Sequence, residues 1–125
     1  RVVCVEHINA RELQANDSRV PYASEGFDVV VGDLSFISLT LVLPALLTVL
    51  KPDGVLLILV KPQFELQPSD IGKGGLVKDA SSYAQVESRL REACAALSLH
   101  VLGYWPSAIA GGDGNQEFWI GARRT

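Results

Sequence analysis

The sequence predicts an α/β fold with a mostly parallel sheet, and three observations support this. Short apolar runs rich in β-branched residues alternate with segments of helical spacing. Residues 55–60 are apolar throughout, which is typical of a central strand covered on both faces. The last two strand-like segments follow each other without a helix, which indicates an antiparallel pair at one edge of the sheet.

Each predicted element has a local signal. Ser38 is a helix N-cap, and the helix after it is apolar on nearly every face, so we expect it to be sandwiched; Pro44 either kinks it or starts its second half. A turn is predicted at 51–54 and a long loop from Pro62 to Lys78. The predicted elements, in order, are strand 2–5, strand 27–31, helix 38–50, strand 55–60, a helix capped by Asp79 with apolar residues as far as Leu97, strand 100–104 and strand 117–122.

Length and composition limit the function classes. The 125 residues are 48% hydrophobic with a net charge of −3, which suits one domain. No apolar run reaches the ~20 residues of a membrane span, and the N-terminus lacks a signal pattern. We therefore expect a cytoplasmic protein without a membrane partner. Cys4 and Cys94 lie far apart in apolar segments, as reduced buried thiols do. The pI of 5.3 is unlike that of a stand-alone nucleic-acid binder.

Polar residues from separate segments converge on one edge of the predicted sheet. In open parallel sheets, ligands bind beyond the carboxyl ends of the strands. Asp33 and Lys61 end two strands, Asn9 and Arg11 follow another, and Glu117 starts the antiparallel strand. Each also has a plainer interpretation, as a turn residue or a solvated strand end. A carboxylate beside a lysine suits proton removal from a weak acid such as a hydroxyl.

Other polar residues are interpreted as structural. Ser35 and Ser38 are expected to be helix caps rather than nucleophiles, because no local motif places a histidine as their base. His7 and His100 lie in strand-like surroundings. No spacing typical of metal ligands occurs, and the glycines at 72–75 do not open a helix after a strand, which excludes a phosphate or dinucleotide loop there.

Five ordered blocks resemble a known family. They are DLSFISL at 33–39, LP at 43–44, VKPQFE at 60–65, GKGG at 72–75 followed by Asp79, and GNQEF at 114–118. Glu6, Asn9 and Arg11 also fit the pattern that follows the third strand of that family. Together these blocks cover the whole chain, and they resemble the TlyA or hemolysin A-type family of FtsJ-like ribosomal RNA 2′-O-ribose methyltransferases.

The resemblance implies a Rossmann-like sheet of an S-adenosylmethionine-dependent methyltransferase, mostly parallel with its last strand antiparallel. Residues 1–125 would then be part of such a domain, without its N-terminal strands, its glycine-rich cofactor loop and an upstream S4-type RNA-binding domain. The implied reaction is methylation of a ribose 2′-hydroxyl in ribosomal RNA, on cytidine in 16S or 23S rRNA, with S-adenosylmethionine as cofactor and ribosomal RNA or a ribosomal subunit as partner. We expect the piece alone to be inactive.

The resemblance also assigns roles to residues. Asp33, Lys61 and Glu117 match catalytic positions, and no metal is implied. Lys61 would draw the proton from the hydroxyl, with the two carboxylates orienting it. The implied cofactor-binding residues are Glu6, Asn9, Asp33 and Leu34. The loop from Gln63 to Lys78 would be a lid or an RNA contact, and the implied RNA-binding residues are Arg11, Lys73 and Lys78.

Two other functions are weighed against this one. A non-catalytic module that associates with RNA or protein would have no need of all three residues Asp33, Lys61 and Glu117. A membrane-active hemolysin is disfavoured, because the sequence has no transmembrane segment and no basic amphipathic helix. A sheet without its first strands would expose an edge, which predicts a homodimer formed through that edge.

Overall fold

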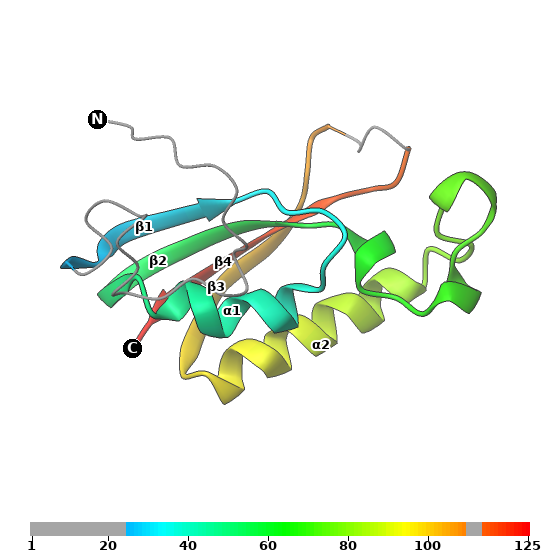
Figure 1. Cartoon of the computed structure of the whole chain (residues 1–125). Coiled ribbons are helices and arrows are strands. Elements are labelled where there is room, and N and C mark those ends of the chain that lie inside the picture. The colour runs from blue at the N-terminus through cyan, green and yellow to red at the C-terminus, as the bar shows by residue number, and fades with distance from the viewer. Residues whose placement is uncertain (1–24, 110–113) are drawn as a thin grey trace.

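The computed structural model of the chain describes residues 25–109 and 114–125, which form one sheet with helices beside it (Figure 1). The predicted strand at 2–5, Cys4 and His7 lie outside these residues. The strands and α-helices are β1 (Phe27–Gly32), α1 (Leu39–Leu47), β2 (Leu50–Val60), α2 (Ser82–Ala96), β3 (Leu99–Pro106) and β4 (Phe118–Arg124).

The order of the strands confirms the predicted fold class. The sheet runs β1-β2-β4-β3, with β1 parallel to β2 and with β4 antiparallel to both of its neighbours. Strands β1, β2 and β3 therefore share one direction, and only the last strand opposes them. The antiparallel pair lies at one edge, as predicted. The homodimer through a sheet edge stays a prediction.

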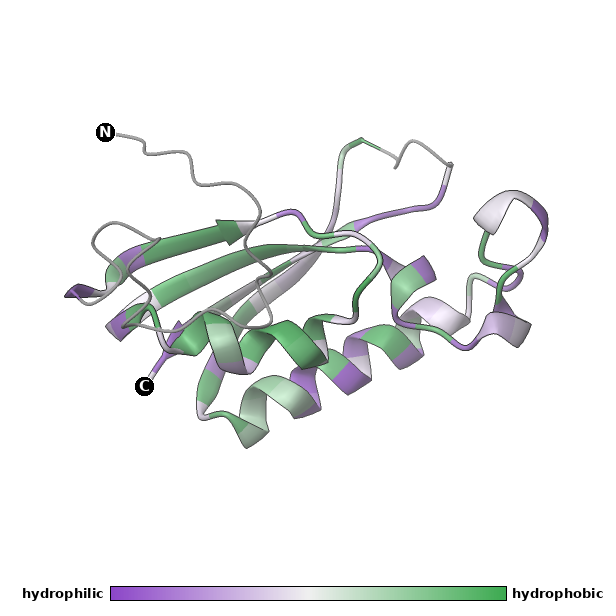
Figure 2. Cartoon of the chain, in the orientation of Figure 1, coloured by the Kyte–Doolittle hydropathy of each residue, from purple (hydrophilic) through white to green (hydrophobic). Residues whose placement is uncertain are grey.

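The core lies between one face of the sheet and the two α-helices (Figures 1 and 2). Alternate residues of β2, namely Leu56, Ile58 and Val60, are fully buried on this face. They pack in one cluster with apolar side chains from both helices: Val42, Leu43, Val86, Leu90 and Cys94. On β1 the opposite face is open, because Val29 and Val31 are exposed.

Helix α1 is shorter and less buried than predicted. It ends at Leu47, because Leu50 already pairs with Phe27 of β1. The helix carries Pro44 within its single run and is buried on one side, while Leu41 is 46% exposed. It is therefore not sandwiched.

The predicted turn at 51–54 lies inside strand β2. The register with β1 shifts between Phe27 and Val29, so these residues loop out of the ladder. Asp53 has a φ of 61°, as in a tight turn. The turn chemistry was therefore predicted correctly, but the strand pairs on both sides of it.

The N-cap of α2 also differs from the prediction. The helix is preceded by Ser81 as its N-cap, and Asp79 lies two residues earlier. The Asp79 carboxylate accepts a hydrogen bond from the backbone N–H of Ser81 at 2.9 Å, which lowers the pKa of Asp79. Asp79 therefore stabilises the turn before the helix.

Candidate active site

The carboxyl ends of β1 and β2 bring together two residues that the sequence predicted for the site. The Nζ atom of Lys61 lies 2.5 Å from Oδ1 of Asp33. The side chain of Lys61 is 14% exposed and that of Asp33 is 65% exposed, so the carboxylate lies at the surface and the lysine beneath it. Both follow parallel strands that end at the same edge of the sheet. The predicted juxtaposition of these two groups is confirmed.

Ser35 is a second partner of Lys61, which the sequence did not predict. The Lys61 amine donates a hydrogen bond to Ser35 Oγ at 2.9 Å. Ser35 was expected to cap the helix, but that role belongs to Ser38 alone, whose side chain accepts from the N–H of Thr40. The spacing of two residues between Asp33 and Ser35 is the signal that could have indicated a shared partner.

Glu117 is at the same edge, next to the end of β2. The antiparallel register pairs Val60 with Phe118, so Lys61 and Glu117 stand opposite each other one step beyond the ladder. Glu117 is buried, and its backbone carbonyl accepts from the Ser107 N–H at 2.7 Å and from the Gln116 amide at 2.6 Å. The structure therefore holds the backbone of Glu117 firmly beside the carboxyl end of β2.

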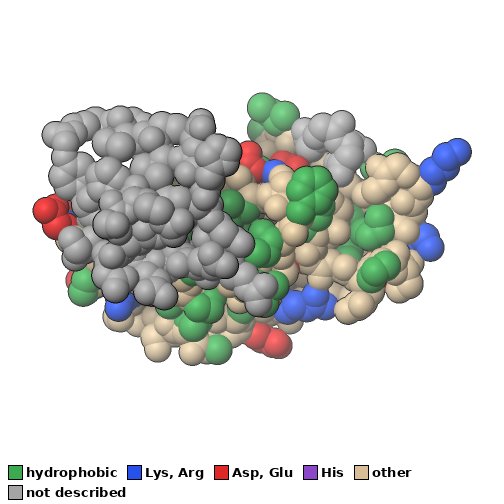
Figure 3. Space-filling model, viewed as in Figure 1, with side chains coloured by type: hydrophobic (Ala, Val, Ile, Leu, Met, Phe, Trp, Pro, Cys, Tyr) green, Lys and Arg blue, Asp and Glu red, His purple; other side chains and the backbone are tan. Residues whose placement is uncertain are grey.

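An exposed aromatic residue stands beside this group. Phe36 is 88% exposed and has a φ of 63°, which is strained for a residue with a Cβ. Its ring lies 5.0 Å from the ring of Phe64, between centroids. In Figure 3 acidic and basic side chains lie together on this face beside exposed apolar groups. The Phe36 ring is therefore an exposed apolar group next to the charged side chains of the candidate site.

Glu65 joins the turn after β2 to the start of α1. Its buried carboxylate accepts from the Leu39 N–H at 2.7 Å and from the Ser38 hydroxyl at 2.5 Å. Its backbone carbonyl accepts from Arg89 of α2. Burial raises the pKa of Glu65, and the hydrogen bonds from Ser38 and Leu39 oppose that rise, as does the charge of Arg89. Sequence reasoning gave Glu65 no role beyond its place in the motif.

The predicted long loop is more ordered than a simple lid. It contains short 3-10 turns at Pro62–Phe64, Pro68–Asp70 and Lys73–Gly75. The buried side chain of Asn115 accepts from the Val77 N–H at 2.9 Å and donates to the Gly75 carbonyl at 2.8 Å. Asn115 therefore clamps the glycine-rich part of the loop near Glu117.

The remaining predicted site residues either make no contact with the Lys61 amine or lie outside the residues that the structure describes. Lys73 and Lys78 are exposed on the clamped loop, and Leu34 packs against the core beside Asp33. Glu6, Asn9 and Arg11 lie outside the described residues.

Residues 25–109 and 114–125 hold neither a cluster of metal-binding side chains nor a membrane-spanning helix. These residues contain no group of three His, Cys, Asp or Glu side chains that could hold a metal ion. None of their helices is long and apolar enough to cross a membrane.

Comparison with known proteins places the chain in a family. The sequence model described as FtsJ-like methyltransferase matches residues 1–124. The 16S/23S rRNA (cytidine-2′-O)-methyltransferase TlyA of Mycobacterium tuberculosis strain H37Rv is 40% identical over 124 residues, which are 98% of this chain and 44% of TlyA. The chain thus spans less than half the length of this relative.

Two solved structures are similar. A candidate hemolysin from Streptococcus thermophilus has a TM-score of 0.84 at 35% identity, over 94% of this chain and 41% of that one. A candidate hemolysin from Lactococcus lactis has a TM-score of 0.87 at 29% identity, over 100% of this chain and 58% of that one. With the strand order and the match over nearly every residue, these findings show that the chain belongs to the FtsJ-like methyltransferase family.

Proposed function

We propose that the protein carrying this chain transfers a methyl group from S-adenosylmethionine to a ribose 2′-hydroxyl of ribosomal RNA, with Lys61 as the base. The observation that carries the proposal is the Lys61 amine held by Asp33 at 2.5 Å and by Ser35 at 2.9 Å, at the carboxyl ends of parallel strands. The name of the mycobacterial relative supports the substrate, since it specifies cytidine 2′-O-methylation of 16S and 23S rRNA.

Lys61 would perform the proton transfer. A ribose hydroxyl is a very weak acid, so its oxygen becomes a good nucleophile only as the proton leaves. In the proposed step the O–H bond breaks and an N–H bond forms on Nζ of a neutral Lys61. Asp33 then offsets the positive charge that develops on the amine, because its carboxylate already lies at 2.5 Å. Glu117 stands opposite Lys61 in the register, where its carboxylate can add to the negative charge near this amine.

The described residues fit the cofactor that the family implies. S-adenosylmethionine supplies, when bound, an electrophilic methyl group on a positively charged sulfur. A site for such a cation needs negative charge at its surface, and Asp33 supplies a 65% exposed carboxylate at the carboxyl end of β1. Asp33 and Leu34, with Glu6 and Asn9, are the residues that we propose for this site.

The surface beside Lys61 supports an RNA substrate. Phe36 offers an exposed ring on which a nucleobase can stack when its ribose hydroxyl reaches Lys61. Lys73 and Lys78 are exposed on the clamped loop, where they can contact phosphates, and Arg11 is proposed for the same role.

The test is a methylation assay with the protein at the full length of its relatives, using ribosomal subunits and radiolabelled cofactor. Lys61→Ala should lower kcat by at least ~100-fold, because a positioned base contributes about 10²- to 10⁴-fold. Cofactor affinity, measured by calorimetry, should stay within about twofold. The matched control is Lys51→Ala, which removes an exposed lysine that pairs with Asp28 at 3.7 Å, away from Lys61.

Two outcomes would contradict the proposal. A Lys61→Ala protein that methylates RNA at the wild-type rate would exclude Lys61 as the base. A wild-type protein that binds subunits but transfers no methyl group would favour a non-catalytic module instead.

A further inference from the structure

We propose that Ser35 is a positioning residue for Lys61, and that it aims the amine at the substrate hydroxyl; this inference rests on the proposed function. A lysine nitrogen has four tetrahedral positions, of which one is its own Cε. The contacts to Asp33 and Ser35 occupy two more. One position is left, which is an N–H in the ammonium form and the lone pair in the neutral form. Because Asp33 and Ser35 fix two of the N–H directions, the remaining N–H or lone pair of the Lys61 amine points in one direction only.

A neutral acceptor suits this task better than a second charge. A carboxylate in place of Ser35 would favour the protonated amine, which cannot accept a proton. The hydroxyl of Ser35 fixes the rotation of the amine without adding negative charge. Asp33 then supplies the charge and Ser35 the orientation, so the two contacts are not redundant.

The loop that carries Ser35 is fixed on both sides of the contact. Asp33 holds one side through Lys61. On the other side, the Phe36 ring contacts Phe64, and Ser38 donates to Glu65 at 2.5 Å. The loop at 33–38 is therefore held against the turn at 61–65 at successive points, so the Ser35 hydroxyl has a defined place. Its position at the surface means that replacing it should leave the fold intact.

The first arm of the test measures methylation kinetics of the full-length protein. Ser35→Ala should lower kcat by roughly 10-fold, the loss expected for one hydrogen bond to a charged group. The KM values for cofactor and RNA should stay within about twofold, since the amine and its charge remain. Ser35→Thr keeps a hydroxyl and should restore kcat to within about threefold of wild type. Ser88→Ala removes an exposed serine of α2 and serves as the matched control.

The second arm reads the lysine itself and needs no activity. In protein labelled with ¹³C at lysine Cε, the two Hε protons of a held side chain differ in NMR shift, whereas those of a rotating one coincide. Lys61→Arg assigns the signal by its disappearance. We expect two well-separated Hε shifts in the wild type and in Ser35→Thr, and a smaller separation in Ser35→Ala, where Asp33 alone holds the amine.

The arms separate the two proposals. A kcat of Ser35→Ala within twofold of wild type overturns the positioning role, as does a loss that threonine does not restore. If the wild-type protein methylates no RNA, the proposed function fails. The NMR arm still decides the case: an Hε separation in Ser35→Ala equal to that of the wild type overturns the inference, and a smaller separation supports it.

Discussion

Replacing Glu65 is expected to loosen the start of helix α1. The buried carboxylate accepts from the Leu39 N–H at 2.7 Å and the Ser38 hydroxyl at 2.5 Å. Glu65→Ala leaves both donors without this acceptor, at about 1–3 kcal/mol each, and removes one buried methylene at about 0.8 kcal/mol. Ser38 keeps its contact with Thr40, which limits the loss. We expect the opening free energy of α1 to fall by about 2–4 kcal/mol in Glu65→Ala.

Glu65→Gln is the matched variant, because its side chain has nearly the same shape. The amide oxygen can accept from Leu39 N–H while the amide nitrogen donates to Ser38 Oγ. Glutamine removes the cost of burying a charge, which stabilises the protein. It also replaces two charge-assisted hydrogen bonds by neutral ones, which offsets that gain. We therefore expect the opening free energy of Glu65→Gln to stay within about 1 kcal/mol of wild type at neutral pH.

The difference between wild type and Glu65→Gln should depend on pH with a definite sign. Burial raises the pKa of Glu65 in the folded protein above 4.5, its value in the unfolded chain. Below pH 4.5 the carboxyl is protonated in both states and its contribution to stability is fully present. As the pH rises through the folded pKa, the folded protein must ionise a buried group, so that contribution is lost. The stability of Glu65→Gln relative to the wild type should therefore rise as the pH increases from 4.5 through the folded pKa of Glu65.

Hydrogen exchange measured by mass spectrometry provides the assay, because it reports the opening of α1 within the full-length protein. Peptides that cover residues 39–47 should exchange at least ~30-fold faster in Glu65→Ala, from the lower end of the estimated loss. Ser88→Ala controls for a general effect of substitution. If these peptides exchange within twofold of the wild-type rate in Glu65→Ala, Glu65 does not stabilise the start of α1.

Three further predictions follow from other contacts. Asn115→Ala removes both partners from the clamped loop, so peptides at 72–78 should exchange ~5- to 10-fold faster, with β2 unchanged as the internal control. Gly121→Ala places a Cβ 3.1 Å from the Trp105 ring, so the ring must shift by a few tenths of an ångström and the tryptophan fluorescence should change; an unchanged emission spectrum would contradict this. Burial raises the pKa of the Cys94 thiol, so alkylation at pH 8 should wait for unfolding, and rapid alkylation of the native protein would show that its site opens.

The parts of the fold that the sequence predicted are those set by local pattern. Ser38 precedes an apolar segment and caps α1, and the apolar run at 55–60 is a central strand. Boundaries failed where a distant strand decides them: Leu50 belongs to β2 because it pairs with Phe27, 23 residues earlier in the chain. No local signal carries that pairing.

The candidate site was predictable to the extent that strand ends determine it. Asp33 and Lys61 end parallel neighbours, so their meeting follows from topology. Ser35 and Glu65 were missed because a serine near a helix start and a glutamate in a loop each have an ordinary local interpretation. Only the folding of the loop at 33–38 against the turn at 61–65 gives them partners.

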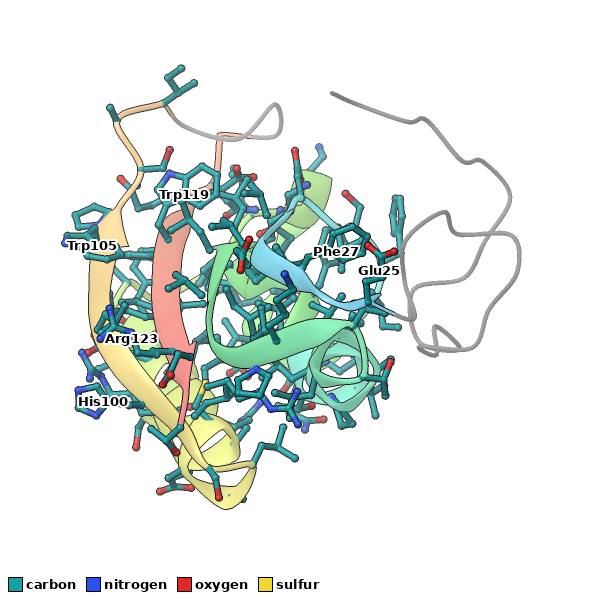
Figure 4. The ribbon with its side chains drawn as sticks, turned by 90° about the vertical axis from the view of Figure 1, so that its left-hand side faces the viewer. Glu25, Phe27, His100, Trp105, Trp119 and Arg123 are labelled. Carbon is teal, nitrogen blue, oxygen red and sulfur yellow. The ribbon has the colours of Figure 1, made fainter. Side chains whose placement is uncertain are left out.

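The residue pairs of β3 and β4 identify the end of the sheet at which the proposed site lies. Figure 4 shows Trp105 and Trp119 on neighbouring strands towards one end, and His100 and Arg123 towards the other. These are cross-strand pairs, as the register of β3 and β4 shows. The end with the paired tryptophans is the end where β2 finishes and Lys61 begins, since Trp119 pairs with Leu59. The cross-strand tryptophan pair therefore marks the end of the sheet at which Lys61 and Glu117 lie.

The two carboxylates that hold the site together differ in role because they differ in surroundings. Asp33 is exposed and lies against an amine, so its carboxylate is both in contact with solvent and paired with Lys61. Glu65 is 6% exposed and faces a backbone N–H and a hydroxyl, so its charge serves only to fix two segments. If their environments were exchanged, the Asp33 charge that the proposed step uses beside Lys61 would be buried. The Glu65 carboxylate that holds the start of α1 would be exposed. The proposed function therefore uses one carboxylate in solvent for chemistry and one under the surface for geometry, and the turn at 61–65 reaches both, because Lys61 pairs with Asp33 and Glu65 is the last residue of the turn.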